Sequence, residues 1–208
     1  MAALGIESPA ELLDRFGLFL DEVELWNGKI DLTNAAGDEL VVRHVLDSLA
    51  GLPAIRERLK PGSGLADIGS GAGFPGIPLA LCLPEAAITL VEPSRKRAAF
   101  LRTAAALLGL AKLEVGEMRL EELSGPFEVL TFRAFKPLDA SLLKRLERVL
   151  APSGSIIAYK GRAEIVGREV AGLREALDRL SLRAETAELR VPFLDEERRL
   201  LIIGRAGS

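Results

Sequence analysis

The sequence predicts an α/β fold: one doubly wound, mainly parallel sheet with a C-terminal antiparallel hairpin and an N-terminal helical extension. After Pro61, short apolar runs of β-type residues alternate with segments of helical spacing. The runs are apolar throughout, which is typical of strands with both faces covered by helices. A chain of 208 residues fits one such domain with a modest extension. We therefore expect residues 1–60 to form a helical extension packed on the core, and residues 61–208 to form the sheet domain.

The extension is expected to be helical because its apolar side chains recur at helical spacing. Over residues 9–27 this spacing predicts a first helix, with Ser8 as its N-cap and Pro9 at the first helical position. The rest of the extension is expected to be a connecting loop at 28–36 and a second helix at about 38–59.

The sheet domain is expected to contain five or more strands and the helices that connect them. The strand-like runs are Leu65–Gly69, Ala87–Glu92, Leu113–Gly116, Glu128–Phe132 and Ser155–Tyr159. The helices are expected at about 76–83, 95–108, 139–150 and 163–179. Two further runs, Leu182–Val191 and Arg199–Arg205, have no helix between them. They must therefore pair antiparallel, as a hairpin at the sheet edge.

The charge of the chain gives no clear indication of nucleic-acid binding. The formal net charge is −3, which argues weakly against it, because phosphates attract Lys and Arg. Residues 133–174 nevertheless carry 9 basic and 4 acidic side chains, whereas residues 1–60 carry 6 and 11. A basic face is possible, but on charge alone we favour ordinary solvated helix surfaces.

Several classes of protein are excluded by composition. No apolar stretch approaches the roughly 20 residues of a membrane span, and the N-terminus lacks the features of a signal peptide. The single cysteine, Cys82, lies in an apolar run and is interpreted as a core residue of a protein from a reducing cytoplasm. With one histidine, His44, and no cluster of ligand-spaced side chains, we expect no metal site.

The strongest chemical signal is the glycine-rich turn in residues 65–78. A buried strand ends at Asp67, and Gly69, Gly71 and Gly73 follow before the next helix. Glycines adopt positive φ without strain and let a ligand approach the backbone closely. In an open α/β sheet this turn lies at the carboxyl end of the first strand, where ligands bind.

A second acidic residue makes the glycine turn more specific. Glu92 ends the next strand, where a carboxylate can accept hydrogen bonds from both hydroxyls of a ribose. The spacing also fits an NAD site, and a plain tight turn is a third interpretation. Pro75 and Pro78 count against NAD, because they remove backbone donors that a diphosphate would need. Asp67 would repel a diphosphate but suits a cation, so the pattern favours S-adenosyl-L-methionine.

The same residues resemble a known family. Asp67–Pro78, Asp-Ile-Gly-Ser-Gly-Ala-Gly-Phe-Pro-Gly-Ile-Pro, looks like motif I of the class I (Rossmann-like) methyltransferases. Its second half resembles the small-subunit ribosomal RNA guanine-N7 methyltransferases, also called glucose-inhibited division protein B. Other matching pieces are Trp26-Asn27, Leu32-Thr33, 42–48, Lys96-Arg97, 100–102, Arg119, Glu121-Glu122, 133–135, 159–161, Val191-Pro192 and Glu197-Arg198. The resemblance covers about residues 12–205, and one departure is Asp31, where the family usually has Asn.

The resemblance implies an activity and its partners. It implies methyl transfer from S-adenosyl-L-methionine to N7 of a specific guanine in 16S ribosomal RNA, by residues 61–208 as the methyltransferase domain. The substrate would be this RNA or the small ribosomal subunit, and we expect a cytoplasmic monomer without a membrane partner. The alternatives are an NAD-dependent oxidoreductase and a non-catalytic RNA-binding assembly factor.

The resemblance also implies site residues, and for each of them an ordinary structural role is the alternative. The cofactor-binding candidates are Asp67, Gly69, Gly71, Phe74, Glu92, Leu120, Glu121 and Arg133. The candidates for positioning the base are His44, Asp47, Arg119, Arg133 and Lys160, and Phe74, Phe135 and Tyr159 are candidates for stacking on it. A lone histidine and a strand-end arginine are also common structural residues, and the aromatic side chains fit a core. Because guanine N7 carries a lone pair and no proton, we expect no residue to act as an indispensable proton carrier.

Overall fold

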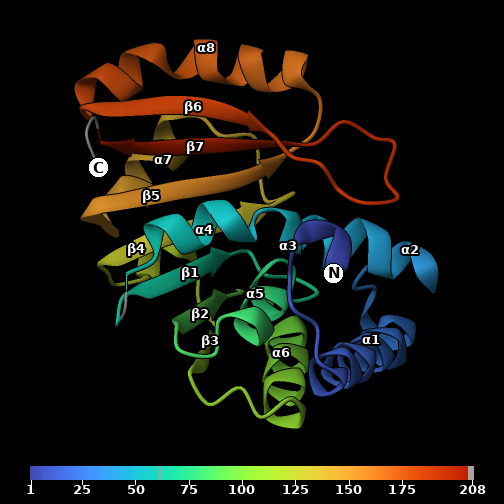
Figure 1. Ribbon diagram of the computed structural model, residues 1–208. Helices are drawn as coiled ribbons and strands as arrows, with labels where there is room; N and C mark the ends of the chain where they lie inside the picture. Colours follow the sequence, from blue (N-terminus) through green and yellow to red (C-terminus); the bar gives the residue numbers. More distant parts are fainter. Residues whose placement is uncertain (61, 206–208) are drawn as a thin grey trace.

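A single sheet of seven strands forms the centre of the molecule (Figure 1). The computed structural model describes residues 1–60 and 62–205, so the predicted break at Pro61 lies outside the described residues. The strands are β1 Gly64–Ile68, β2 Ala87–Val91, β3 Leu113–Gly116, β4 Phe127–Arg133, β5 Leu150–Lys160, β6 Leu182–Glu188 and β7 Arg199–Arg205. Their order is β3-β2-β1-β4-β5-β7-β6, and β7 is antiparallel to both of its neighbours. The predicted parallel sheet with an antiparallel hairpin is confirmed.

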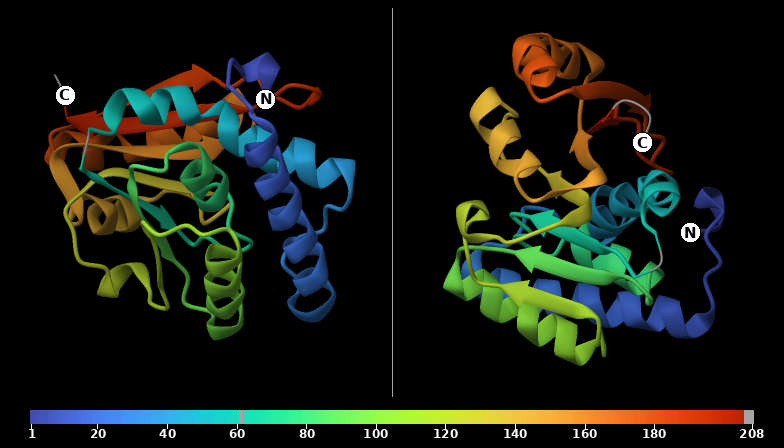
Figure 2. Two further views of the ribbon diagram at one scale, coloured as in Figure 1. Left: turned by 60° about the horizontal axis from the view of Figure 1, so that its bottom comes forward. Right: turned by 90° about the vertical axis from the view of Figure 1, so that its left-hand side faces the viewer.

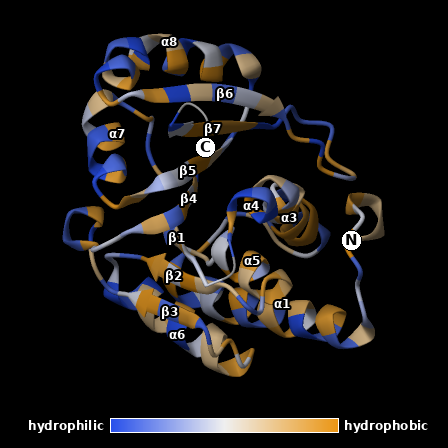
Figure 3. Cartoon of the chain, turned by 60° about the vertical axis from the view of Figure 1, so that its left-hand side comes forward, coloured by the Kyte–Doolittle hydropathy of each residue, from blue (hydrophilic) through white to orange (hydrophobic). Residues whose placement is uncertain are grey.

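Helices cover both faces of the sheet, as the apolar strands require. They are η1 Ala2–Leu4, α1 Ala10–Ile30, α2 Asp38–Leu40, η2 Val41–Leu46, α3 Asp47–Ala50, α4 Leu52–Arg58, α5 Gly76–Cys82, α6 Arg95–Leu107, η3 Leu120–Glu122, α7 Ala140–Glu147 and α8 Ala163–Arg179. Figure 2 shows α1 and α6 side by side on one face, and these two helices are in contact. On the other face α7 and α8 contact each other and strands β5 to β7. Hydrophobic and hydrophilic patches alternate along α8, as in a helix that covers a sheet (Figure 3). None of the described helices has the length and apolar character that a membrane crossing requires.

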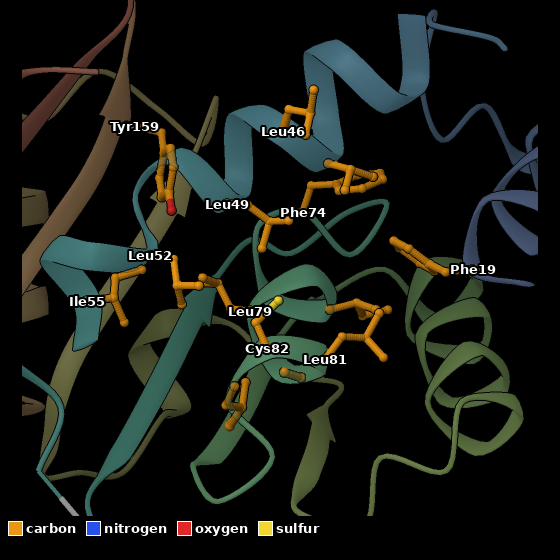
Figure 4. Packing of buried hydrophobic residues seen from close by; sticks show 14 of the residues in the cluster. Phe19, Leu46, Leu49, Leu52, Ile55, Phe74, Leu79, Leu81, Cys82 and Tyr159 are labelled. Atoms are coloured by element: carbon orange, nitrogen blue, oxygen red, sulfur yellow. The ribbon is translucent and has the colours of Figure 1, made fainter. Parts of the chain in front are cut away.

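The N-terminal helices share a core with the sheet. Phe19 of α1, Leu49 of α3 and Leu52 of α4 are fully buried in one cluster with Leu79 of α5 (Figure 4). Burying such side chains is worth roughly 1.5–3 kcal/mol each before entropy is counted. The helices of residues 1–60 are therefore attached to the sheet by apolar packing.

Tyr159 of β5 fixes the junction between α3 and α4. Its buried hydroxyl donates a hydrogen bond to the carbonyl oxygen of Ser48 over 2.6 Å. A Cβ atom on Gly51, which separates the two helices, would lie 2.3 Å from the same hydroxyl oxygen. Only glycine lets the junction approach the sheet this closely.

Three local expectations were wrong. The Ser8 hydroxyl donates to the carbonyl oxygen of Ile6 over 2.9 Å and does not cap α1, whose N-cap is Pro9. The helix also runs on to Ile30, three residues into the predicted loop. The segment predicted as one helix at 38–59 is divided into α2, the π-helical η2, α3 and α4.

The end of α7 also differs from the expectation. The helix ends at Glu147, and β5 begins at Leu150 instead of Ser155. Leu150 pairs with Phe127, with a register shift before Val129, so the Pro-Ser-Gly stretch at 152–154 is an irregular part of the strand and not a turn.

Substituting Gly51→Ala should destabilise the protein by about 1–3 kcal/mol, because the new methyl group overlaps the Tyr159 side chain. Denaturant unfolding measures the change. The matched control is Gly17→Ala within α1, where a Cβ has no heavy atom within 4 Å. The control should be neutral or stabilising by up to about 1 kcal/mol. Equal effects of the two substitutions would contradict the packing described.

Candidate active site

The glycine turn follows β1 at the carboxyl edge of the sheet, next to the point where the strand order reverses between β1 and β4. The amides of Gly69 and Ser70 both donate to the carbonyl oxygen of Val91, over 2.8 and 3.2 Å. The turn is thereby fixed to the end of β2. Gly69, Gly71 and Gly73 have φ of 74°, 54° and 85°, so the predicted positive-φ turn is confirmed.

Glu92 is held by the same turn. Its side chain is buried, and Oε2 accepts the Gly71 amide over 3.0 Å while Oε1 accepts the Ser94 amide over 2.8 Å. An ionised carboxylate has about four lone-pair sites, so each oxygen can accept one more donor. The carboxylate is fixed in place and retains capacity for two hydroxyl groups.

Asp67 lies beneath the turn and is fully buried. One oxygen, Oδ2, accepts the Gly76 amide over 3.0 Å, and Oδ1 has no hydrogen-bond partner among the described residues. Burial raises the pKa of Asp67 to about 7, because the charged form loses its water. A cation placed near Oδ1 would restore the charged form.

The first turn of α5 offers no amide to a phosphate. Pro75 and Pro78 have no N–H group, the Gly76 amide donates to Asp67, and the Ile77 amide donates to the carbonyl oxygen of Gly73 over 2.8 Å. A diphosphate needs free amides at this place. The arrangement disfavours a dinucleotide.

Arg133, at the end of β4, joins two of the predicted residues. One guanidinium nitrogen donates to Asp47 Oδ2 over 2.9 Å and to the carbonyl oxygen of Arg43 over 2.7 Å. The other lies 2.6 Å from His44 Nδ1, and the guanidinium carbon lies 5.4 Å from the centre of the Phe74 ring. The sequence placed these residues in separate segments, and the fold brings them together.

His44 is neutral in this arrangement. Arginine can only donate, so His44 Nδ1 must accept from Arg133, and the proton is on Nε2, 2.6 Å from the Thr33 hydroxyl oxygen. Burial and the Arg133 charge lower the pKa of His44 to about 4. The ring also stacks on Phe74, with centres 4.8 Å apart. Near neutral pH, His44 is a positioning group without a charge.

Asp47 connects the cluster to the loop between β6 and β7, which reaches toward α2 and α3 in Figure 1. Asp47 Oδ1 forms an ion pair with Arg198 Nε at 3.3 Å, without hydrogen-bond geometry. Glu196 Oε1 in turn pairs with Arg43 over 2.6 Å. Sequence reasoning noted Arg198 only as part of a motif, and its partner in α3 is far away along the chain.

The remaining predicted residues near the cofactor turn lie in or beside η3. Leu120 is buried in the core on the α7 side of the sheet. Glu121 is exposed and paired with Arg145, and a backbone hydrogen bond and this arginine lower the pKa of its carboxyl group. Arg119 is exposed, and its backbone amide donates to Glu122 over 2.8 Å. Contact of these residues with an adenine or a base stays a prediction.

A cavity of about 980 Å³ lies beside the Arg133 cluster. Its lining comes from the ends of β4 and β5, the segment 134–140 and α8, together with η2, Asp47 of α3 and Arg198 of the loop between β6 and β7. Phe135 lines it and also lies against the glycine turn, since a Cβ on Gly69 would be 2.3 Å from the Phe135 ring. Lys160 lines it too, paired with Glu169 of α8 over 2.7 Å. Sequence reasoning missed Glu169, which looks like an ordinary charge of an amphipathic helix.

Within residues 1–60 and 62–205, no group of three or more His, Cys, Asp or Glu side chains is placed to hold a metal ion. Cys82 is buried, and burial raises the pKa of its thiol to about 11.

Comparison with known proteins gives a family match. The sequence model described as "GidB: rRNA small subunit methyltransferase G" matches residues 13–201. The protein named Ribosomal RNA small subunit methyltransferase G from Halorhodospira halophila is 43% identical over 84% of this chain and 80% of its own length. The protein of the same name from Geobacter sulfurreducens is 39% identical over 98% of this chain and 93% of its own.

Solved structures support the fold. A putative O-methyltransferase from Klebsiella pneumoniae superimposes with a TM-score of 0.60 at 20% identity, covering 90% of each chain. A ribosomal protein L11 methylase from Lactobacillus delbrueckii subsp. bulgaricus gives 0.58 at 19% identity, covering 77% of each chain. The predicted class I methyltransferase fold is confirmed.

The raised pKa of Asp67 predicts a pH effect on stability. The folded chain keeps this proton up to about pH 7, whereas an ordinary Asp releases it near pH 3.8. Stability therefore falls as the pH rises from about 4 to about 7 and is constant above that, as far as Asp67 is concerned. Asp67→Asn should remove this contribution, so its melting temperature relative to wild type should rise between pH 5 and pH 8. A difference that is independent of pH would contradict a buried, uncharged Asp67.

Proposed function

The chain belongs to the GidB family, rRNA small subunit methyltransferase G, and from this premise we propose that it methylates N7 of a specific guanine in 16S ribosomal RNA, using S-adenosyl-L-methionine. The observation that carries the proposal is the carboxylate of Glu92, held by the Gly71 and Ser94 amides beside the glycine turn. Such a carboxylate is suited to the two hydroxyls of an adenosyl ribose.

The residues beneath the turn fit a cationic ligand. The unpartnered Oδ1 of Asp67 is a buried acceptor at the start of the glycine turn. When bound, S-adenosyl-L-methionine supplies an electrophilic methyl group on a sulfonium, and its amino group adds a second positive charge. A cofactor of this charge favours the ionised form of Asp67, whereas the diphosphate of NAD would oppose it. Together with the occupied amides of α5, this supports the methyl donor over the nicotinamide cofactor.

No proton has to be removed in the proposed transfer. Guanine N7 forms the new bond to carbon with its own lone pair, and the bond from carbon to sulfur breaks with its electrons remaining on sulfur. A neutral His44, held between Thr33 and Arg133, fits this requirement, because it orients the arginine and carries no charge. We propose that Arg133, His44 and Asp47 position the reactants. Positioning of this kind lowers the activation free energy of a reaction between two molecules by several kcal/mol.

The charge around the cavity supports an RNA substrate. Of the residues that line it, six are basic and three are acidic, although the whole chain has a net charge of −3. The basic residues are Arg43, Arg133, Lys136, Lys160, Arg168 and Arg198, and the acidic residues are Asp47, Asp139 and Glu169. A locally positive cavity attracts phosphate groups. Glutamates outside the lining pair with Arg43, Arg168 and Arg198, so the positive excess of this face is small.

We further propose that residues 61–208 form the methyltransferase domain and that residues 1–60 are an extension of it. The extension supplies His44 and Asp47 to the site and shares an apolar cluster with α5, which supports one functional unit. A monomer in the cytoplasm, where 16S ribosomal RNA is methylated, remains the expectation.

Glu92→Gln should weaken binding of S-adenosyl-L-methionine by roughly 10–100-fold, because a charge-assisted hydrogen bond is worth about 1.5–3 kcal/mol. Isothermal titration calorimetry measures the affinity. Glu11→Gln, at an exposed position in the first turn of α1, is the matched control and should bind as wild type does. Unchanged affinity of the Glu92 variant would remove Glu92 from the cofactor site.

A methylation assay tests the activity directly. The protein should transfer labelled methyl groups to 16S ribosomal RNA, either naked or in the small subunit, at the N7 position of one guanine. Cleavage of the RNA chain at 7-methylguanosine locates the modified nucleotide. Label at another atom, or in another RNA only, would overturn the proposed acceptor. Binding without transfer to any RNA form would support the assembly-factor alternative.

A further inference from the structure

We propose that Lys160 and Glu169 together recognise the Watson–Crick edge of the acceptor guanine, and so determine which base is methylated. This inference rests on the proposed function and names two specificity-determining residues for it. The observations that carry it are the position of the pair in the cavity, an unused oxygen of Glu169, and the chemistry of guanine.

The pair lies where an unstacked base would enter. Lys160 ends β5, Glu169 lies on α8, and both line the cavity together with Phe135 and Arg133. Their side chains are only 13% and 11% exposed. Phe135 lies between this cavity and the glycine turn, so the cavity adjoins the proposed cofactor site. An ion pair removed from water costs desolvation energy and needs further partners to compensate for it.

Glu169 has a hydrogen-bonding capacity that the described chain does not use. Lys160 Nζ and the Leu138 amide both donate to Oε1 of this carboxylate. No described residue donates to Oε2. The ammonium group of Lys160 has three N–H donors, of which one points to Glu169. The pair thus offers the cavity an acceptor and, beside it, a donor.

Guanine presents the complementary arrangement. Its N1–H and 2-amino groups donate, and the adjacent O6 accepts, whereas adenine presents an accepting N1 and a donating 6-amino group. A carboxylate facing N1 with an ammonium facing position 6 therefore fits guanine, and an adenine in the same orientation meets it with two mismatched groups. Proteins that bind unstacked bases commonly form hydrogen bonds to this edge. N7 lies on the Hoogsteen edge, which meets the Watson–Crick edge at O6, so a guanine held through N1–H and the 2-amino group keeps N7 free for the methyl donor.

The contact between the guanine and the Glu169 carboxylate should also strengthen during the reaction. Methylation at N7 gives the base a positive charge, which makes N1–H and the 2-amino group stronger donors. A carboxylate that accepts from them stabilises the transition state more than the bound substrate, and such differences raise the rate of the chemical step. Glu169 is then expected to affect kcat as well as KM.

Inosine tests the contact without altering the protein, because it keeps O6, N1–H and N7 and lacks only the 2-amino group. The substrate is 16S ribosomal RNA carrying guanosine or inosine at the nucleotide that the wild-type protein methylates. The wild-type protein should prefer guanosine by about tenfold or more in kcat/KM, the effect of one lost charge-assisted hydrogen bond. Equal turnover of the two RNAs would overturn the inference and leave the proposed methylation intact. Failure to methylate the guanosine RNA would count against the proposed function instead.

Glu169→Gln assigns the preference to this residue. The variant keeps an oxygen for Lys160 and Leu138, so the segment 134–140 retains its contact with α8. We expect kcat/KM for guanosine RNA to fall by roughly 10–100-fold. The preference for guanosine over inosine should shrink to about twofold or less, because the variant no longer accepts a charge-assisted hydrogen bond from the 2-amino group that inosine lacks. Affinity for S-adenosyl-L-methionine should stay within about twofold of wild type.

The matched control is Glu175→Gln, which removes an exposed carboxylate paired with Arg179 on the same helix. It should keep both the rate and the preference. A Glu169 variant with reduced activity but the wild-type preference for guanosine would show that the residue only supports the segment 134–140. That result would overturn the recognition role.

Discussion

The closure of the glycine turn onto the end of β2 is the interaction on which the site depends. Val91 accepts two amides of the turn, and the Glu92 carboxylate accepts a third, from Gly71. The turn can make these bonds because three of its residues are glycines with positive φ. It thereby fixes an acidic side chain over bare backbone at the carboxyl edge of a parallel sheet. Any ligand of this crevice must present donors to Glu92 and tolerate the buried Asp67 beneath it.

A second set of contacts holds Arg133 at the end of β4, in the candidate site. Arg133 ends β4, and three acceptors from the N-terminal extension hold its guanidinium: His44, Asp47 and the Arg43 carbonyl oxygen. The π-helical η2 contains two of these acceptors, and π-helical turns are frequent at functional sites. The extension is thus part of the site as well as of the core. The cavity in which we propose that the base binds is lined by this same cluster: Arg43, His44, Asp47 and Arg133.

The sequence predicted those features that depend on local pattern. The strands Leu113–Gly116 and Arg199–Arg205 and the helix Ala163–Arg179 have the predicted bounds, because apolar periodicity decides them. The partnership of the glycine turn with Glu92 could be predicted because parallel strands place their carboxyl ends at one edge.

Features that depend on tertiary contacts could not be predicted in the same way. The helix expected at 38–59 is interrupted where its carbonyl groups accept side chains from β4 and β5. Asp67 looked open to a ligand, yet one of its oxygens accepts an amide of the following helix. The pairing of Glu169 with Lys160 could not be predicted, because it depends on how α8 packs against the end of β5.

Calorimetric titration of the wild-type protein with S-adenosyl-L-methionine and, separately, with NAD measures the charge preference of the crevice most directly. The crevice has an acid on each side of the glycine turn, and the first turn of α5 has no free amide. It should therefore bind one equivalent of the sulfonium compound and take up no NAD at the same concentrations. Saturable binding of NAD with no heat from S-adenosyl-L-methionine would contradict a site built for a cationic adenosyl ligand.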